Sequence, residues 1–203
     1  MVMKQPFTTT SPTLASYSFT ELLTNQGYLT FYPMVVRNPA ATKVLNTIQT
    51  KTTDTYSTAV QAGTLTFESS TTDQTRTVEG KAFIEYSMAI SDTAAGAASG
   101  EWTFELFKVK GAAATSLGSV TGETITHDAT GWAVYTQSVC YIEISKTPLH
   151  AGDFIRLVCT SDVSSHGTDQ LALFHDPTDT AETAPLAASS TIMKVSIPFR
   201  KPN

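Results

Sequence analysis

The chain has 203 residues, a formal net charge of −5, and charged side chains at only 15% of its positions. This length is sufficient for one β-sandwich with its own core. The acidic balance and the lack of any Lys/Arg run argue against nucleic acid as a partner, because that binding needs cations that neutralise phosphates. No apolar run reaches about 20 residues and no signal peptide is readable, so we expect no membrane partner and synthesis in the cytoplasm.

Threonine takes the place of the missing charged residues, and it occurs 35 times. Soluble domains usually carry about 25% charged residues. Threonine is β-branched and uncharged, which suits the half-exposed face of a sheet and disfavours helix surfaces. The composition therefore favours an all-β protein.

The first 18 residues are rich in Thr, Ser and Pro and show no periodicity, which predicts an extended N-terminal arm over residues 1–18. Residues 19–203 are predicted to form one domain. Its first apolar run is Tyr28–Val36, and Pro33 within this run indicates an edge or a bulge.

Apolar and polar residues alternate with a period of two in the segments 81–90, 139–145, 154–160, 171–173 and 193–199. The apolar phase shifts near Leu106 and Phe107, which predicts a bulge there. Pro198 suggests that the last strand lies at an edge. With weaker segments included, the pattern predicts a single jelly-roll-like antiparallel β-sandwich of roughly nine or ten strands.

The motifs of catalysis are missing from the sequence. The four histidines, at positions 127, 150, 166 and 175, form neither H-x-H nor H-x-x-x-H, and no G-x-S-x-G elbow is present. We therefore expect that the protein is not an enzyme, that it has no catalytic residues, and that it binds neither a cofactor nor a metal. A hydrolase whose catalytic residues lie far apart in sequence is the alternative that this search leaves open.

The two cysteines, Cys140 and Cys159, both fall at inward positions of predicted strands. We interpret them as small core residues, and a single bridge between neighbouring strands is the other reading.

The candidates for a surface contact are Trp132, which follows a turn, and the acidic loop residues Asp176, Asp179 and Glu182. Aromatic faces suit sugar rings, and carboxylates suit Ca²⁺, for which Asp162 and Asp169 could add ligands. Packing is the simpler use of Trp132, and turn formation is the simpler use of the acidic loop, because the glycine-punctuated calcium signature is missing.

The most informative stretch is Ile142–Leu157, which reads as a strand, the turn Leu149-His-Ala-Gly152-Asp153 and a second strand, with Leu171–Phe174 following. It resembles the Leu-x-x-Gly-Asp turn of jelly-roll domains of the tumour-necrosis-factor and complement-globular-head type, and late strands of tailed-phage decoration and head-fibre proteins. In this turn Gly152 can take a positive φ and Asp153 can cap the amides. The resemblance implies a homotrimer.

We therefore expect a virion structural protein, a phage capsid decoration or head-fibre protein that binds other capsid subunits. The chain ends, residues 1–13 and 196–203, are expected to contribute to assembly contacts, in part as added strands. A receptor- or glycan-binding fibre tip that uses the loops near Trp132 and Asp176–Glu182 is the alternative.

Overall fold

The computed structural model describes residues 26–34, 44–47, 57–60, 63–92, 97–164, 169–174 and 193–200. These residues form strands, turns and loops but no helix, and so include no helix that could span a membrane. The strands are β1 (Gln26–Met34), β2 (Val44–Thr47), β3 (Ser57–Val60), β4 (Gly63–Glu68), β5 (Arg76–Asp92), β6 (Ala98–Lys110), β7 (Ala113–Thr121), β8 (Ile125–His127), β9 (Gly131–Leu149), β10 (Phe154–Ser164), β11 (Gln170–Phe174) and β12 (Lys194–Arg200).

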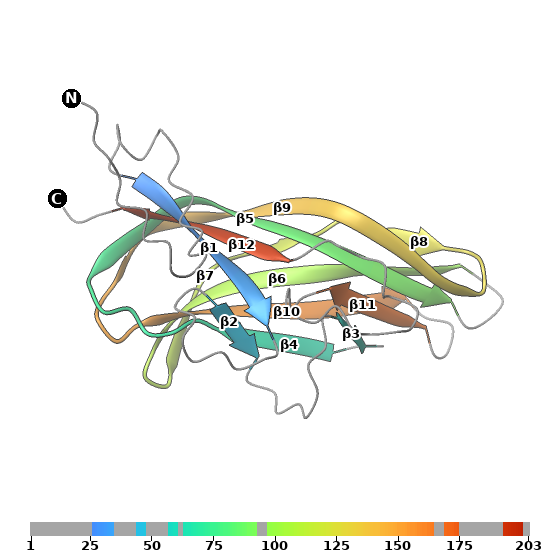
Figure 1. Cartoon of the computed structure of the whole chain (residues 1–203), viewed down its shortest axis with the longest axis horizontal. Helices are drawn as coiled ribbons and strands as arrows, with labels where there is room; N and C mark the ends of the chain where they lie inside the picture. The colour runs from blue at the N-terminus through green and yellow to red at the C-terminus, as the bar shows by residue number, and fades with distance from the viewer. Residues whose placement is uncertain are drawn as a thin grey trace, which may run out of the picture.

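The strands form two packed sheets whose long members run along the longest axis of the molecule (Figure 1). In sheet A, β5 pairs with β9 on one side and with β12 and β11 on the other, and β1 and β3 lie outside these two. In sheet B, the order is β2, β4, β10, β6 and then β7 and β8. Neighbouring strands are antiparallel except β1 and β2, so the predicted all-β antiparallel sandwich is confirmed.

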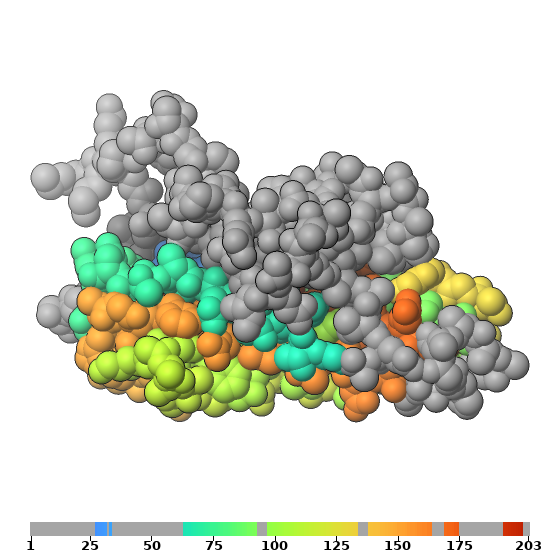
Figure 2. Space-filling model, turned by 90° about the horizontal axis from the view of Figure 1, so that it is seen from below, coloured from blue at the N-terminus to red at the C-terminus, as the bar shows by residue number. Residues whose placement is uncertain are grey.

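Figure 2 shows the outer face of sheet B, where β4, β10 and the β6–β7 hairpin follow one another in teal, orange and yellow-green. The core lies between the sheets, and its largest fully buried side chains include Trp102, Tyr86, Phe67 and Phe104. The rings of Tyr86 and Phe104 lie 4.8 Å apart between centroids, so β5 and β6 are in direct contact across the sandwich.

Irregular positions account for most differences from the predicted strands. The bulge predicted in β6 is confirmed, because the register with β7 shifts between Leu106 and Phe107. The predicted segment 139–145 is part of a longer, 19-residue strand, β9, whose pairing with β5 shifts register between Tyr86 and Met88. This irregularity, in a polar stretch, interrupts the alternation and made the strand look shorter than it is.

The two prolines behave differently from each other. β1 pairs with β12 up to Phe31 and with β2 from Tyr32 onward, so Pro33 lies where β1 passes from sheet A to sheet B. The prediction of an edge strand at Pro198 is wrong, because β12 lies between β1 and β5. The register with β5 shifts between Ser196 and Phe199, and this bulge accommodates a residue that has no N–H for the ladder.

Candidate functional site

Four side chains form an apolar band on the outer face of sheet A: Tyr28, Phe83, Val139 and Tyr141, which we name the outer stripe. They come from β1, β5 and β9 and occupy positions that alternate with core residues. Phe83 pairs with Tyr141 across the β5–β9 ladder, and Tyr28 lies beyond β12. Val139 is 61% exposed, Tyr141 50% and Phe83 36%.

The aromatic rings of the outer stripe lie in a row. The centroid of Phe83 is 6.0 Å from that of Tyr28 and 6.4 Å from that of Tyr141. The Nζ atom of Lys81 lies 4.2 Å from the centroid of Tyr141, within the range of a cation–π contact. These contacts order the rings, while Phe83 and Tyr141 remain partly exposed to solvent.

Charges of both signs border the outer stripe. Lys194 lies 3.4 Å from Glu85, measured between Nζ and Oε2, and both side chains are half-buried. Lys81 lies on one flank and Glu143, its ladder partner, is exposed. The face therefore combines an apolar centre with a mixed, near-neutral rim.

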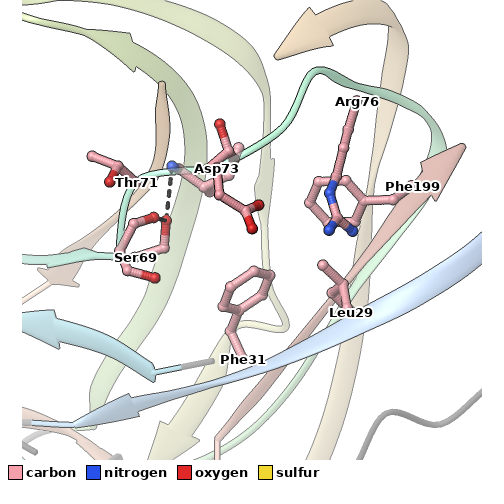
Figure 3. Close-up of a pocket in the computed structure, with 10 residues that line it drawn as sticks. Leu29, Phe31, Ser69, Thr71, Asp73, Arg76 and Phe199 are labelled. Atoms are coloured by element: carbon pink, nitrogen blue, oxygen red, sulfur yellow. Dashed lines mark hydrogen bonds between the residues drawn. The ribbon is translucent and has the colours of Figure 1, made fainter. Parts of the chain in front are cut away.

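A second candidate site is a pocket of about 540 Å³ at the end of the sandwich where β1, β12 and the β4–β5 loop meet; we name it the end pocket (Figure 3). Its apolar lining comes from Leu29, Phe31, Ile155 and Phe199, and its polar lining from residues 69–73 and Arg76. Figure 3 shows that Asp73 and Arg76 enter from the side opposite Leu29 and Phe31.

The wall of the end pocket is fixed by hydrogen bonds to the β9–β10 turn. The Thr72 amide donates to the Asp153 carbonyl at 2.7 Å, and the Gly152 amide donates to the Thr72 carbonyl at 2.8 Å. The Thr72 hydroxyl donates to the carbonyl of His150 at 2.7 Å. The Ile155 amide donates to the Ser69 hydroxyl at 3.0 Å. Loop and turn therefore form one hydrogen-bonded unit.

The turn itself has the geometry expected from its sequence. Gly152 has φ +90°, which a residue with a Cβ rarely adopts. Asp153 is buried, accepts the His150 amide at 2.8 Å and lies 3.2 Å from Nζ of Lys108. Burial alone would raise the pKa of Asp153, but the His150 amide and Lys108 outweigh it, so this pKa lies below its usual value. Asp153 is thus an ionised cap.

Of the predicted surface contacts, only Trp132 lies within the described residues. It is the second residue of β9, is half-buried and packs against the buried cluster of Ala89, Ala172 and Phe174. Asp176, Asp179 and Glu182 lie outside the described residues, so a contact through this loop stays a prediction. No group of three or more His, Cys, Asp or Glu side chains that could hold a metal occurs in the described ranges.

Both cysteines lie in strands facing the core, as expected, and both are free thiols. Burial raises the pKa of Cys140 to about 12, and burial also raises the pKa of Cys159. Such thiols are protonated at neutral pH and are poor nucleophiles.

Sequence reasoning missed the outer stripe, although a signal was present. Val139 and Tyr141 share the phase of Glu143, opposite to that of Cys140 and Ile142. Large apolar residues at the solvent-facing positions of an alternating strand indicate an exposed apolar patch. The end pocket left no such signal, because it joins residues from distant segments.

Comparison with known proteins identifies no family. No family model matches the chain, and no curated protein matches it. Solved structures with a similar fold include an α-amino acid ester hydrolase, with 9% identity and a TM-score of 0.46, and an aminopeptidase from a marine sediment archaeon (Thaumarchaeota), with 8% and 0.44. A CocE/NonD-family hydrolase from Staphylococcus aureus has 9% identity and a TM-score of 0.48.

These matches cover 68%, 68% and 87% of this chain but only 25%, 26% and 37% of those proteins, in the same order. The chain therefore spans between a quarter and two fifths of their length, and the likeness concerns the fold alone. The resemblance to tumour-necrosis-factor, complement-head and phage virion domains is wrong, since the structural matches are to β-sandwich parts of hydrolases and aminopeptidases. The Leu149–Asp153 turn misled because a positive-φ glycine followed by a capping aspartate suits many strand connections.

Proposed function

We propose that this chain is a non-catalytic structural protein of a virion, such as a capsid decoration or head-fibre protein, that binds neighbouring protein subunits through the outer stripe. The observation that carries the proposal is the exposed row of Phe83, Tyr141 and Val139 on sheet A. Large apolar side chains that cluster on a surface mark sites of association, whereas single ones do not.

The chemistry of the outer stripe supports a protein as the occupant. Protein interfaces have an aromatic and aliphatic centre with a polar rim, and Tyr and Phe are enriched in them. Here the centre is the outer stripe, and the rim contains Lys81, Glu85 and Lys194. A rim with both signs of charge suits another copy of this chain, because each sign can meet its opposite across a symmetric contact.

The virion context rests on sequence features: the threonine-rich, low-charge β-domain suits a protein that works by packing against its neighbours. The homotrimer was implied by the resemblance alone, so the number of subunits stays a prediction. The structure changes the expected part of one chain end. Residues 196–200 are held between β1 and β5, so both of their hydrogen-bonding edges are occupied within this chain. Ser196 instead lies between Thr30 and Phe83 on the outer face and belongs to the proposed contact surface.

The test is the mass of the full chain in solution, measured by sedimentation velocity from about 1 to 100 μM. We expect the wild type to form an oligomer, and we expect the Val139→Lys oligomer to dissociate already at higher concentration, because a charged lysine weakens the apolar contact. Thr160→Lys, at an exposed position of β10 on sheet B, is the matched control and should associate like the wild type. A monomer at all concentrations, or equal association of both variants, would contradict self-association through this face.

A glycan-binding tip is the second candidate, because exposed aromatic rings also accept the apolar faces of sugars. The outer stripe offers Tyr141 and Phe83 for this purpose, in addition to the predicted loops near Trp132 and Asp176–Glu182. A glycan array with wild type and Tyr141→Ser separates the candidates. Binding that Tyr141→Ser abolishes would replace the assembly function with carbohydrate recognition.

A further inference from the structure

We infer that the end pocket binds a compact amphipathic anion, an apolar group that carries a carboxylate, and that Arg76 receives the carboxylate. The inference does not depend on the outer stripe. In β1, Tyr28 belongs to the outer stripe and its neighbour Leu29 lines the end pocket, so one strand serves two separate surfaces.

The apolar part of the ligand is defined by the floor of the pocket. Phe31, Ile155 and Phe199 are core residues that still contribute surface to the cavity, and Leu29 completes the floor. A cavity of about 540 Å³ falls within the range of small-molecule sites. Two phenylalanine rings in this floor favour an aromatic or branched apolar group.

The charged part of the ligand follows from Arg76 and Asp73. Both line the cavity, and Figure 3 shows both side chains directed into the same space. Within the part of the chain that the structure describes, no ion pair joins Arg76 to Asp73 or to another carboxylate. Arg76 is therefore a cation on an apolar pocket with its guanidinium open to a ligand.

Arg76 outweighs Asp73 for two reasons. Arg76 is half-buried, whereas Asp73 is exposed, and water screens the more exposed charge more strongly. Arg76 is also the first residue of β5 and is paired with Leu149 in the ladder, while Asp73 belongs to a loop. The ladder fixes the backbone of Arg76, and its guanidinium presents paired donors that match the two oxygens of a carboxylate.

The pocket is formed before any ligand binds. Residues 69–72 are tied to the β9–β10 turn by main-chain and hydroxyl hydrogen bonds. A wall held in this way loses little conformational freedom on binding, which favours affinity for a small ligand.

Two sources could supply this chemistry: a free carboxylic acid, or the C-terminal carboxylate of a peptide that ends in an apolar residue. Titration calorimetry with N-acetyl-L-phenylalanine, its amide and 3-phenylpropanoate separates them. We expect N-acetyl-L-phenylalanine to bind with a dissociation constant on the order of 1 mM, typical of a ligand of this size. If N-acetyl-L-phenylalanine binds more tightly than 3-phenylpropanoate, the site is assigned to a peptide terminus. If the two ligands bind equally, the site is assigned to a free acid.

Matched variants test the carboxylate and its receptor. Arg76→Gln should weaken binding about 5- to 10-fold, Asp73→Asn should strengthen it about 2-fold, and Arg156→Gln on sheet B should leave it unchanged. The affinity of the wild type for the amide should be as low as the affinity of Arg76→Gln for the acid. The Arg76→Gln variant should bind acid and amide with equal affinity.

The inference would be overturned if N-acetyl-L-phenylalanine did not bind at a concentration about 10-fold above the expected dissociation constant. Equal affinities of Arg76→Gln and Arg156→Gln for this ligand would overturn it as well. A loss with Asp73→Asn as large as that with Arg76→Gln would overturn the role of Arg76 as the carboxylate receptor, because the removal of a negative charge should not weaken the binding of an anion. The comparison of acid with amide needs only the wild type, so the inference stays testable if a variant fails to fold. Association of the chain through the outer stripe is unaffected by any of these outcomes.

Discussion

The two outer faces of this sandwich differ in how their side chains are satisfied. On sheet B, polar groups pair with one another: Thr103 with Thr121 at 3.0 Å, Ser116 with Glu105 at 2.7 Å, and Arg156 with Glu68 at 2.6 Å. On sheet A, the outer stripe keeps apolar surface in water. A face that is satisfied internally gains little from a partner, whereas an exposed apolar face gains by being covered. The comparison therefore supports the proposal that sheet A is the face for association.

The largest expected effect comes from the core that holds both faces together. Phe104 is fully buried and contacts Tyr86 across the sandwich. Phe104→Ala should lower the free energy of unfolding by about 3–5 kcal/mol, because it removes apolar contacts and leaves a cavity. Urea denaturation followed by circular dichroism measures this change. A loss below about 1 kcal/mol would mean that the two sheets do not depend on this contact.

A smaller loss is expected at the buried end of sheet B. Asp153→Asn removes the charge that faces Lys108 and should lower the free energy of unfolding by about 1–3 kcal/mol at pH 7. The folded-state pKa of Asp153 is lowered, so the ionised carboxylate stabilises the fold. This stabilisation is fully present at a pH above the unfolded-state pKa, which is about 4. It is lost as the pH falls through the folded-state pKa. Denaturation curves from pH 7 to 2 should therefore converge for variant and wild type, and a constant difference would contradict the assignment.

The outer stripe itself should contribute to association rather than to folding. Val139→Lys should change the free energy of unfolding of the monomer by less than about 0.5 kcal/mol, because the side chain is exposed. Thr160→Lys should have an equally small effect, so that the variants differ only in association. Thermal melts at low concentration provide this measurement. Strong destabilisation by Val139→Lys alone would show that the position is structural.

The smallest effect concerns the thiols, which should be inert in the folded chain. Burial raises the pKa of Cys140 to about 12, so almost no thiolate is present at pH 8. Iodoacetamide should modify Cys140 and Cys159 at pH 8 far more slowly in native protein than in urea-unfolded protein. Mass spectrometry counts the adducts. Rapid labelling of Cys140 in the native chain would mean that β9 opens readily, and rapid labelling of Cys159 would mean the same for β10.

The sequence allowed the strands to be predicted where burial is one-sided. Residues 154–160 alternate because β10 has one face on the core, and this period is visible in any such strand. In β5 the alternation continues to Ile90 although residues 86–92 are all buried, because the positions between the large apolar residues are the small residues Ser87, Ala89 and Ser91. Alternation fails at short strands such as β3, which offers only four residues. Period therefore locates a strand of sufficient length, but it does not show whether the second face of the strand is covered.

The candidate sites were less predictable, for a different reason. The outer stripe depends on register, because Phe83 meets Tyr141 only through the β5–β9 pairing. The end pocket depends on topology, because Leu29, Arg76 and Phe199 are brought together by three strands far apart in sequence. A pattern within one strand carries neither kind of information. Trp132, predicted from its local turn, packs against other residues of the fold.

The position of β12 has a consequence for biosynthesis. The strand β12, Lys194–Arg200, lies between β1 and β5. The sheet-A partner of Gln26 is Arg200, so β1 can form this pairing only after β12 has been synthesised. While the ribosome is still adding these residues, β1 and the adjoining edge of β5 have no partner there. Pairings of such long sequence separation form slowly and leave strand edges open in the meantime. Sheet A is therefore completed only after β12 has been synthesised. Until then the nascent chain has unpaired strand edges that can pair with other chains.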